Sequence, residues 1–573
     1  MGSREAARDL IQTAEQTNGA DALWIAKARG SFVAFDASHI LGPKSGMGRV
    51  NIMGDRNVYA IKISKASKRG ILSRGELEMA KYLMCVFFFL CPAIGSVAAN
   101  AQEARAGQIV IEPYTLNTHD GREHPAELGR LSVRESRNGN SSRLVQLAYV
   151  RLRSTAAQPA SPIVFLAGGP GIPGIGLGQV PVYFGLFDRL REVSDVILLD
   201  QRGTGMSSPN LQCPPATLPS DTFENTEKWL QSYAQIVRTC ADHWRAEGVD
   251  LAAYNSNSSA DDLDDLRRAL GAERLSLLAW SYGTELALAT VRRHGERLDR
   301  VVLASTRGPD NLLKLPSVWD SQIRRISLLA AEDPNINKNV PDMEALMRRV
   351  LDRLERNPMS VTVTDRRANR QVDLRIGSIG LRTLIRGDLN NARAFASLPA
   401  LLYTIDQGDY SILTRRMEQL YNGFGISAMS LATDCATGWS AARLARTRRE
   451  ARGALMSNVN LQWSPDICRL TGSADLGSRF RSRIRSTLPT LFLSGTLDPN
   501  APSAQSEEVS RGFASGVHLI VENADHESLP AVEIQSVVVD FFKGQNVSGR
   551  RISLPRPRFV SVEEAKSPPA SRP

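Results

Sequence analysis

Residues 274–294 read RLSLLAWSYGTELALATVRRH, and this stretch decides the fold. Its first seven residues are mostly apolar, as in a strand that is buried on both faces of a sheet. The residues after Gly283 have the composition of a helix. Ser281 therefore lies at a sharp turn between a buried strand and a helix. Units of this kind predict an α/β fold with a mostly parallel sheet.

The turn around Ser281 has the pattern of a nucleophile elbow, in which a serine at the apex exposes its hydroxyl. The usual G-x-S-x-G appears here as Ala279-Trp280-Ser281-Tyr282-Gly283. The elbow needs small residues on either side of the serine, and Ala279 still meets that need. The alternative is a chance serine between a strand and a helix. The strand–turn–helix context favours Ser281 as a nucleophile.

Two further loops follow predicted strands. SPIVFLA leads into Ala167 and the glycine loop 168–171, GGPG, and DVILLD leads into the polar loop that continues to residue 207. In open α/β sheets, active sites lie at the carboxyl ends of the strands. Glycines in such a loop leave backbone N–H groups free to face a developing oxyanion.

An acid and a base for Ser281 occur near the end of the chain. The predicted strand PTLFLSG precedes Asp498, and the predicted strand GVHLIVE precedes His526. The chain has seven histidines, and His526 is the one in the loop after this last predicted strand. Asp525 is a rival acid, but adjacent residues rarely face each other, so Asp498 is favoured. The order serine, acid, base is the one found with nucleophile elbows.

Length and charge limit the class of protein. The chain has 573 residues, which favours a core domain with an insertion or a second domain. Its formal charge is +10, of which residues 1–101 carry +5 (13 Lys+Arg against 8 Asp+Glu) and the remaining residues, with 57 against 52, carry the rest. The basic residues form no stripe and no known recognition module, so no nucleic-acid partner is expected.

Residues 82–98, YLMCVFFFLCPAIGSVA, form the most apolar stretch of the chain. Lys81 before it and the small residues Ala99 and Ala101 after it complete the pattern of a secretory signal peptide over residues 79–101. A spanning helix needs about 20 apolar residues, so this run is too short for a stable membrane anchor. We therefore expect an exported bacterial protein, periplasmic or extracellular.

A signal peptide begins a protein, yet 78 residues precede Met79. Arg74-Gly75-Glu76 can be encoded by AGGAGA-like DNA, which resembles a bacterial ribosome-binding site. We expect translation to start at Met79 and residues 1–78 to be a leader without a structural role. A genuine N-terminal extension is the alternative.

Cleavage after Ala101 leaves four cysteines: Cys213, Cys240, Cys435 and Cys468. An even number in an exported protein favours disulfides. Four cysteines allow three pairings, and the local one, Cys213–Cys240 with Cys435–Cys468, closes loops worth about 3–4 kcal/mol each. A zinc site is the competing interpretation, but no CxxC or His-rich spacing supports it, and no metal is expected.

The segments GGPG, DQRGTGMSSP, SYGTELALATVRRH, SGTLDP and NADHES occur in this order. Together they resemble the prolyl iminopeptidase and tripeptidyl aminopeptidase family of serine peptidases, over roughly residues 110–560. The resemblance implies an α/β-hydrolase fold with an inserted, mostly helical lid. The expected parts are a core at 102–309 and 486–545, a lid at 310–485 and a C-terminal tail at 546–573. The cysteines resemble those of the secreted branch, in which one pair begins at the cysteine of LQC and a second pair lies in the lid.

The resemblance also assigns roles. It implies that Ser281 is the nucleophile, that His526 is the general base and then the acid, and that Asp498 fixes the tautomer of His526. The backbone N–H of Tyr282, with that of Gly169 or Gly168, is expected to form the oxyanion hole. Two residues depart from the family's motifs, and these departures bear on the substrate specificity. Ala167 stands where single-domain iminopeptidases carry the histidine of HGGPG, and Ala279 replaces the usual elbow glycine.

The expected function is that of an exopeptidase, which releases an N-terminal residue or short peptide through an acyl-enzyme without an organic cofactor. One alternative is a carboxylic-ester hydrolase with the same triad, because the fold does not set the acyl substrate. A remote alternative is an inactive hydrolase-like binding protein. The expected partner is a peptide or a small acyl substrate.

An aminopeptidase must bind a protonated amine, which calls for carboxylates in a closed pocket. The lid offers several acids, and the sequence singles out none of them: Glu332, Asp333, Asp388, Asp406, Asp409 and Asp434.

The signal-peptide pattern yields the first prediction. The mature protein is expected to begin near Gln102 and to be found outside the cytoplasm. N-terminal sequencing of the exported protein checks it, and residues 1–78 present in that protein would contradict it.

Overall fold

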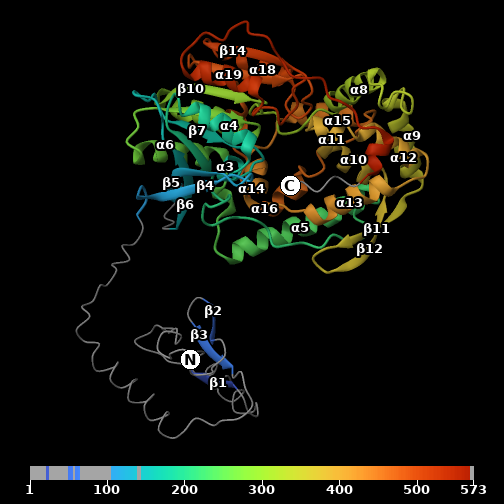
Figure 1. Cartoon of the computed structure of the whole chain (residues 1–573), viewed down its shortest axis with the longest axis horizontal. Helices are drawn as coiled ribbons and strands as arrows, with labels where there is room; N and C mark the ends of the chain where they lie inside the picture. The colour runs from blue at the N-terminus through green and yellow to red at the C-terminus, as the bar shows by residue number, and fades with distance from the viewer. Residues whose placement is uncertain (1–20, 25–49, 56–57, 65–104, 138–142, 568–573) are drawn as a thin grey trace. The chain divides into compact units, whose positions relative to one another are not determined.

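The computed structural model describes residues 21–24, 50–55, 58–64, 105–137 and 143–567 (Figure 1). The chain divides into two units, Met1–Gln102 and Glu103–Pro573. In the first unit, strands β1 (Asp21–Trp24), β2 (Val50–Asp55) and β3 (Val58–Ser64) form an antiparallel sheet with the order β1-β3-β2. The predicted signal peptide, residues 79–101, and the rest of the predicted leader lie outside the described residues.

The second unit is built on a ten-stranded sheet with the order β15-β14-β13-β10-β9-β7-β8-β6-β5-β4. The strands from β8 to β15 in this order run parallel, while β4, β5 and β6 add an antiparallel flank. Their bounds are β4 Ile109–Asn117, β5 Glu123–Arg134, β6 Leu144–Leu152, β7 Ile163–Leu166, β8 Val196–Asp200, β9 Leu275–Trp280, β10 Leu298–Ala304, β13 Thr490–Gly495, β14 Gly516–Glu522 and β15 Ile552–Ser553.

Helices cover both faces of this sheet, as the continuous apolar strands require. In β9, Leu275, Leu277 and Ala279 belong to a core shared with α6 and α7. The alternate residues Leu278 and Trp280 belong to the opposite core, shared with α4 and α19. The helices of this part are α3 Gly174–Gly178, α4 Pro181–Leu190, α5 Thr226–Ala246, η2 Leu251–Ala253, α6 Ser256–Ala269, α7 Tyr282–His294, η3 Gly295–Arg297, α18 Ser503–Ser510, α19 Val532–Phe542 and α20 Val562–Lys566.

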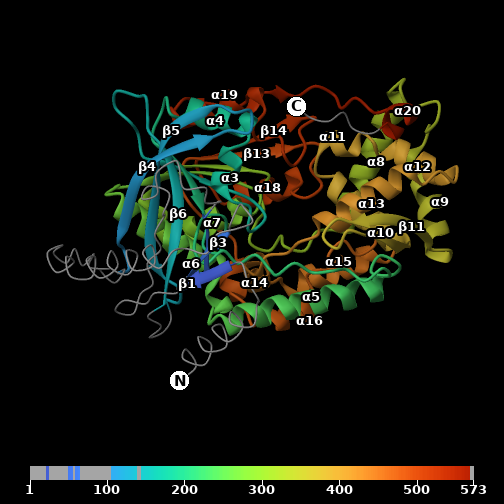
Figure 2. The ribbon, with the colours of Figure 1, turned by 60° about the horizontal axis from the view of Figure 1, so that its bottom comes forward.

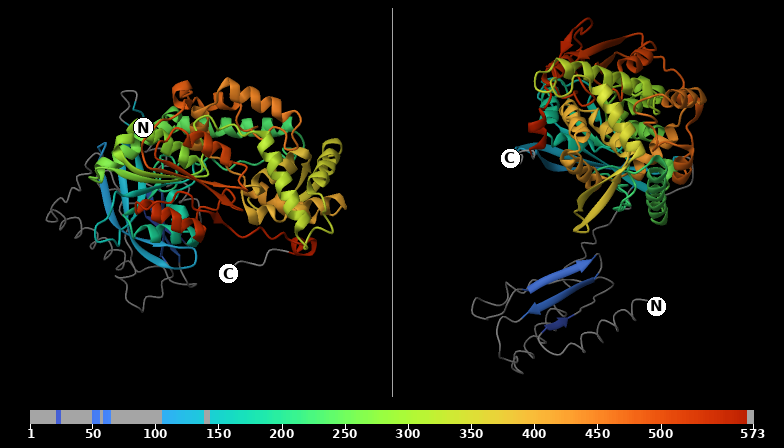
Figure 3. Two further views of the ribbon diagram at one scale, coloured as in Figure 1. Left: turned by 90° about the horizontal axis from the view of Figure 1, so that it is seen from above. Right: turned by 90° about the vertical axis from the view of Figure 1, so that its right-hand side faces the viewer.

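The chain between β10 and β13, here called the inserted segment, is mostly helical and has its own core. Figures 1 and 2 show its helices grouped beside the sheet, with α5 alongside α16. A hairpin, β11–β12, extends from these helices (Figure 3). Its elements are α8 Pro316–Glu332, α9 Met343–Arg356, β11 Met359–Asp365, β12 Arg370–Ile376, α10 Ser378–Asp388, α11 Ala392–Phe395, α12 Leu398–Asp406, α13 Ser411–Gly423, α14 Ala428–Thr437, α15 Ala441–Ala451, α16 Pro465–Thr471 and α17 Gly477–Arg481.

The polar loop after β8 is held by two buried charges. Asp200 accepts the backbone N–H groups of Ile175 at 2.9 Å and Met206 at 2.7 Å. Arg202 donates to both carboxylate oxygens of Asp262 on α6, at 2.7 Å each. Because these partners fix the loop from several sides, its charged residues are structural rather than available to a substrate.

Two disulfides cross-link parts of the second unit that lie near each other in the sequence. Cys213, after β8, pairs with Cys240 on α5 across 27 residues, and Cys435 on α14 pairs with Cys468 on α16 across 33 residues. This is the local pairing favoured from the sequence. Among the described residues, no helix is both long and apolar enough to cross a membrane.

The disulfides generate the second prediction. Peptide mapping without reduction is expected to recover Cys213–Cys240 and Cys435–Cys468. Replacing either pair by serine should lower the free energy of unfolding by about 3–4 kcal/mol, because the unfolded chain loses a cross-link. Free thiols at all four positions would contradict the pairing.

Candidate active site

Ser281 occupies a strained turn between β9 and α7. Its φ and ψ are 56° and −123°, a conformation that costs a non-glycine residue about 1–3 kcal/mol. The turn is held on both sides, since the Ser281 N–H donates to the Ala304 carbonyl at 3.0 Å and its carbonyl accepts from Thr284 N–H at 2.9 Å. These hydrogen bonds hold the turn in its strained conformation, which exposes the serine side chain.

Close backbone packing explains the small residues around the elbow. A Cβ at Gly283 would lie 2.0 Å from the Leu166 carbonyl oxygen, so this position excludes every larger side chain. A Cβ at Gly168 would lie 2.9 Å from the Ser281 Cβ. Ala279 is fully buried, which agrees with the need for a small residue before the turn.

The structure brings Ser281, His526 and Asp498 together. The Ser281 Oγ lies 2.9 Å from His526 Nε2, and His526 Nδ1 lies 2.9 Å from Asp498 Oδ2. His526 and Asp498 are buried. This chain of two hydrogen bonds lets His526 accept the serine proton while Asp498 fixes the ring.

The surroundings of Asp498 stabilise its ionised form. Burial alone would raise its pKa, but His526 and the N–H of Ala501 lower it below its ordinary value. Its Oδ1 accepts the backbone N–H groups of Asn500 at 2.9 Å and Ala501 at 2.8 Å. Asp498 can therefore stay ionised at neutral pH and stabilise the imidazolium that forms during catalysis.

The rival acid Asp525 has other partners. Its carboxylate accepts the N–H of Ala392 at 2.6 Å and the hydroxyl of Ser528 at 2.7 Å. The loop that carries His526 is held from the elbow as well, because Trp280 Nε1 donates to the His526 carbonyl at 2.7 Å. The base is thus oriented through both its ring and its backbone.

The expected oxyanion donors lie beside the serine. Tyr282 begins α7, so its N–H is at the positive end of a helix. Gly169 lines the same cavity as Ser281 and has a φ of 106°, which only glycine adopts readily. Gly168 packs behind the serine, and its carbonyl accepts from Ile172 N–H at 3.3 Å. Gly169 lines the cavity and Gly168 does not, so we expect Gly169 to be the second donor beside Tyr282.

Ser281 opens into a cavity of about 300 Å³ between the sheet and the inserted segment. This volume is at the low end for small-molecule sites and suits a small acyl group. The cavity is lined by Gly169, Pro170, Tyr233, Ser281, Arg307, Lys314, Arg386, Ser430, Leu431, Asp434, Gln462, Trp463 and Asn500.

Of the six acids that the sequence left open, Asp434 lines this cavity and the other five do not. Four of those five have basic partners elsewhere: Glu332 with Arg556, Asp388 with Arg416, Asp406 with Arg353, and Asp409 with Lys566. The remaining one, Asp333, accepts the backbone N–H groups of Asn335 and Phe559.

Sequence reasoning missed the cavity's basic residues. Arg307 and Lys314 come from the loop after β10, and Arg386 comes from α10. No sequence motif contains them. The loop after β10 does follow the carboxyl end of a parallel strand, where active-site residues of open α/β sheets lie, and this position could have suggested Arg307 and Lys314.

Arg307 lies between two carboxylates. Its Nε is 2.7 Å from Glu285 Oε2, an ion pair whose N–H is not aligned for a hydrogen bond. Its Nη2 donates to Asp434 Oδ1 at 2.7 Å, and Trp463 Nε1 donates to Asp434 Oδ2 at 2.9 Å. Burial opposes the charge of Arg307, but Glu285 and Asp434 raise its pKa above the ordinary value.

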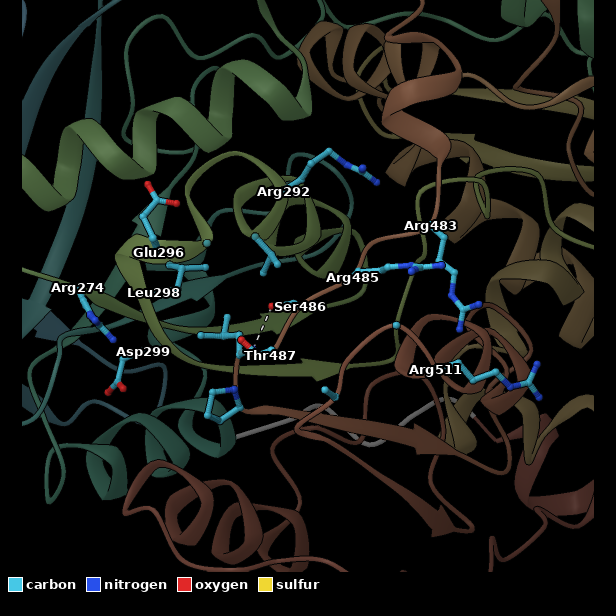
Figure 4. Close-up of a pocket in the computed structure, with 16 residues that line it drawn as sticks. Arg274, Arg292, Glu296, Leu298, Asp299, Arg483, Arg485, Ser486, Thr487 and Arg511 are labelled. Atoms are coloured by element: carbon cyan, nitrogen blue, oxygen red, sulfur yellow. Dashed lines mark hydrogen bonds between the residues drawn. The ribbon is translucent and has the colours of Figure 1, made fainter.

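A second cavity, of about 1200 Å³, contains none of the predicted site residues. Figure 4 shows Arg274, Arg292, Arg483, Arg485 and Arg511 around it. It lies at the amino ends of β9, β10 and β13, whereas Ser281, Asp498 and His526 follow carboxyl ends. The smaller cavity is therefore the candidate active site.

The chain belongs to the alpha/beta hydrolase fold family, whose model matches residues 161–530, more than half of its length. This confirms the predicted fold class, an α/β-hydrolase fold with a mostly parallel sheet flanked by helices. Within the described residues, no group of three or more His, Cys, Asp or Glu side chains is placed to hold a metal ion.

Three relatives match part of the chain, and two of them are peptidases, in agreement with the resemblance seen in the motifs. A putative hydrolase of Escherichia coli, YuaR, is 30% identical over 30% of this chain and 32% of its own length. The serine protease Hip1 of Mycobacterium tuberculosis is 27% identical over 32% of this chain and 36% of its own length. A tripeptidyl aminopeptidase of Streptomyces coelicolor is 24% identical over 38% of this chain and 41% of its own length. The chain spans about a third to two fifths of the length of the curated relatives it matches.

Solved structures are more distant. The proline iminopeptidase of Mycobacterium smegmatis is 16% identical, covers 72% of this chain and 98% of its own, and has a TM-score of 0.35. An esterase of Thermogutta terrifontis is 15% identical, covers 72% and 98%, and has a TM-score of 0.32.

The site geometry generates the third prediction. Ser281→Ala and His526→Ala should each lower turnover by several orders of magnitude, and Asp498→Asn should lower it by about 10⁴. A fluorophosphonate should label Ser281, as read by mass spectrometry of the modified peptide. Ser430→Ala is the matched control, since this second serine lines the same cavity and its loss should leave the label in place. Activity retained by Ser281→Ala would refute the assignment.

Proposed function

We propose that this hydrolase is an exported serine exopeptidase that releases an N-terminal residue or short peptide. The observation that carries the proposal is the cavity at Ser281, which is small and includes the carboxylate of Asp434. A small cavity suits the end of a chain better than its middle, and a carboxylate suits a protonated amine.

The chemistry follows from the hydrogen bonds of the triad. Ser281 Oγ attacks the acyl carbonyl while its proton passes to His526 Nε2. The N–H groups of Tyr282 and Gly169 would stabilise the oxyanion. His526 returns the proton to the leaving amine, and the acyl group remains on Ser281. Water, deprotonated by His526, then attacks the ester and releases the acid.

Asp434 has capacity left for an amine. A carboxylate offers about four acceptor positions, and Arg307 and Trp463 occupy one on each oxygen. An ammonium group bound here would complete a charged cluster with Glu285 and Arg307. An uncharged amide nitrogen would bind this cluster much more weakly than an ammonium group.

Export is supported by the signal-peptide pattern and by the two disulfides, which persist in oxidising compartments. The main alternative remains a carboxylic-ester hydrolase. Asp434 is already paired with Arg307, which weakens its hold on an amine, and the triad acts on esters equally well.

The fourth prediction separates the two functions. An aminoacyl or tripeptidyl anilide with a free amine should be hydrolysed at least 100-fold faster, in kcat/KM, than its N-acetylated twin, because acetylation leaves buried charge unpaired. Asp434→Asn should reduce this ratio toward one if it folds like the parent. Equal rates on both substrates, or activity confined to esters, would favour the ester hydrolase.

A further inference from the structure

Two cations of the Ser281 cavity lack a carboxylate partner. Arg307 is paired with Glu285 and Asp434, but Lys314 and Arg386 form no ion pair with any described residue. Buried charges are costly unless they are paired, so two such groups in one small cavity require an explanation.

Lys314 is fixed by its backbone and not by its side chain. Its N–H donates to Asn460 Oδ1 at 2.6 Å, and its carbonyl accepts from Asn460 Nδ2 at 2.8 Å. The residue is 5% exposed, and its ammonium group has no hydrogen-bond partner among the described residues. Burial, reinforced by Arg307 and Arg443, lowers the pKa of Lys314 to about 7, against the opposing effect of Asp498 and Asp434.

Arg386 is also held by neutral groups. With the Gln462 amide turned so that its oxygen faces Arg386, that oxygen accepts from Nη1 and Nη2 at 3.0 and 2.6 Å. The guanidinium lies 5.5 Å from the centre of the Trp463 ring. Its Nε has no partner among the described residues. Burial lowers the pKa of Arg386 to about 10. Tyr233 and Asp434 favour its charge from a distance, but no carboxylate of the described residues lies within ion-pair distance of the guanidinium.

The lining of the cavity therefore holds more basic than acidic side chains. Its side chains include three basic groups, Arg307, Lys314 and Arg386, and one carboxylate, Asp434. We propose that Lys314 and Arg386 form a carboxylate subsite, which selects substrates whose acyl group bears an acidic side chain. The inference rests on the proposed function at Ser281 and adds the substrate class.

An N-terminal glutamate or aspartate fits this arrangement. Its α-amine would face Asp434, and its side-chain carboxylate would face the ammonium of Lys314 and the guanidinium of Arg386. Each charge of the substrate would then meet an opposite charge in a site with little water, where such pairs are stronger than in solution. The neutral isostere glutamine would leave both cations unpaired.

The fifth prediction uses paired anilides with free amines, glutamyl and glutaminyl. The parent protein should hydrolyse the glutamyl anilide at least 10-fold faster in kcat/KM. Lys314→Met should remove most of this preference by slowing the glutamyl substrate, with a smaller effect on the glutaminyl one. Lys543→Met is the matched control, because this exposed lysine is bound to Glu192. No preference in the parent, or equal slowing of both substrates by Lys314→Met, would overturn the subsite.

A second pair makes the test independent of amine recognition. The mono-4-nitrophenyl ester of glutaric acid and the matching ester of glutaramic acid differ in the acyl carboxylate and carry no amine. If neither anilide is hydrolysed, the exopeptidase proposal fails, yet the acidic ester should still react at least 10-fold faster than its amide. Equal rates on the two esters would overturn the carboxylate subsite itself.

Thermal denaturation separates binding from a purely structural role. Glutarate at millimolar concentration should raise the Tm of the Ser281→Ala protein, because it binds the folded state, and Lys314→Met should abolish the rise. Without ligand, Lys314→Met should leave the Tm unchanged or higher, since it removes a buried unpaired charge. A lower Tm together with an intact glutarate effect would show that Lys314 serves packing and not recognition.

Discussion

Arg307 connects the catalytic turn to the cavity. It contacts Glu285, one turn into the helix that begins at the nucleophile, and Asp434 on α14 of the inserted segment. Glu285 is fully buried and also accepts the hydroxyls of Ser256 at 3.0 Å and Thr437 at 2.6 Å. Burial raises its pKa, while Arg307 counteracts the rise. Removing Arg307 would leave two buried carboxylates together, so this guanidinium helps to hold α14 beside α7.

The motifs predicted the strands and loops of the sheet because each obeys a local rule. A buried apolar run makes a strand, and a small residue marks a close backbone approach, as at Gly283. The β11–β12 hairpin was not anticipated within a lid expected to be mostly helical, since its alternation of polar and apolar residues is short and weak. Helix α6 begins at Ser256, and Asn255 caps it because the Asn255 side chain accepts the Ser258 N–H.

The triad residues follow predicted strands, and so sequence order alone could suggest that they meet. The cavity residues are different in kind. Lys314 and Arg386 lie far apart in the sequence, and they line one cavity as a result of tertiary packing. A lysine in a loop is usually solvated, whereas the side chain of this one is buried with no ion-pair partner in the part of the chain that the structure describes. Local sequence patterns carry no information about which basic residues are left without an acid.

The end of the chain is part of the site's support. Strand β15 pairs with β14, and Asn523, shortly before His526, donates to the Leu554 carbonyl at 2.9 Å. Phe559 is buried, and α20 packs on α12 and α13 of the inserted segment. These residues thus position the loop that carries the base from outside that loop. A proteolytic nick between α19 and β15 would leave all three triad residues in one piece and remove part of what positions His526.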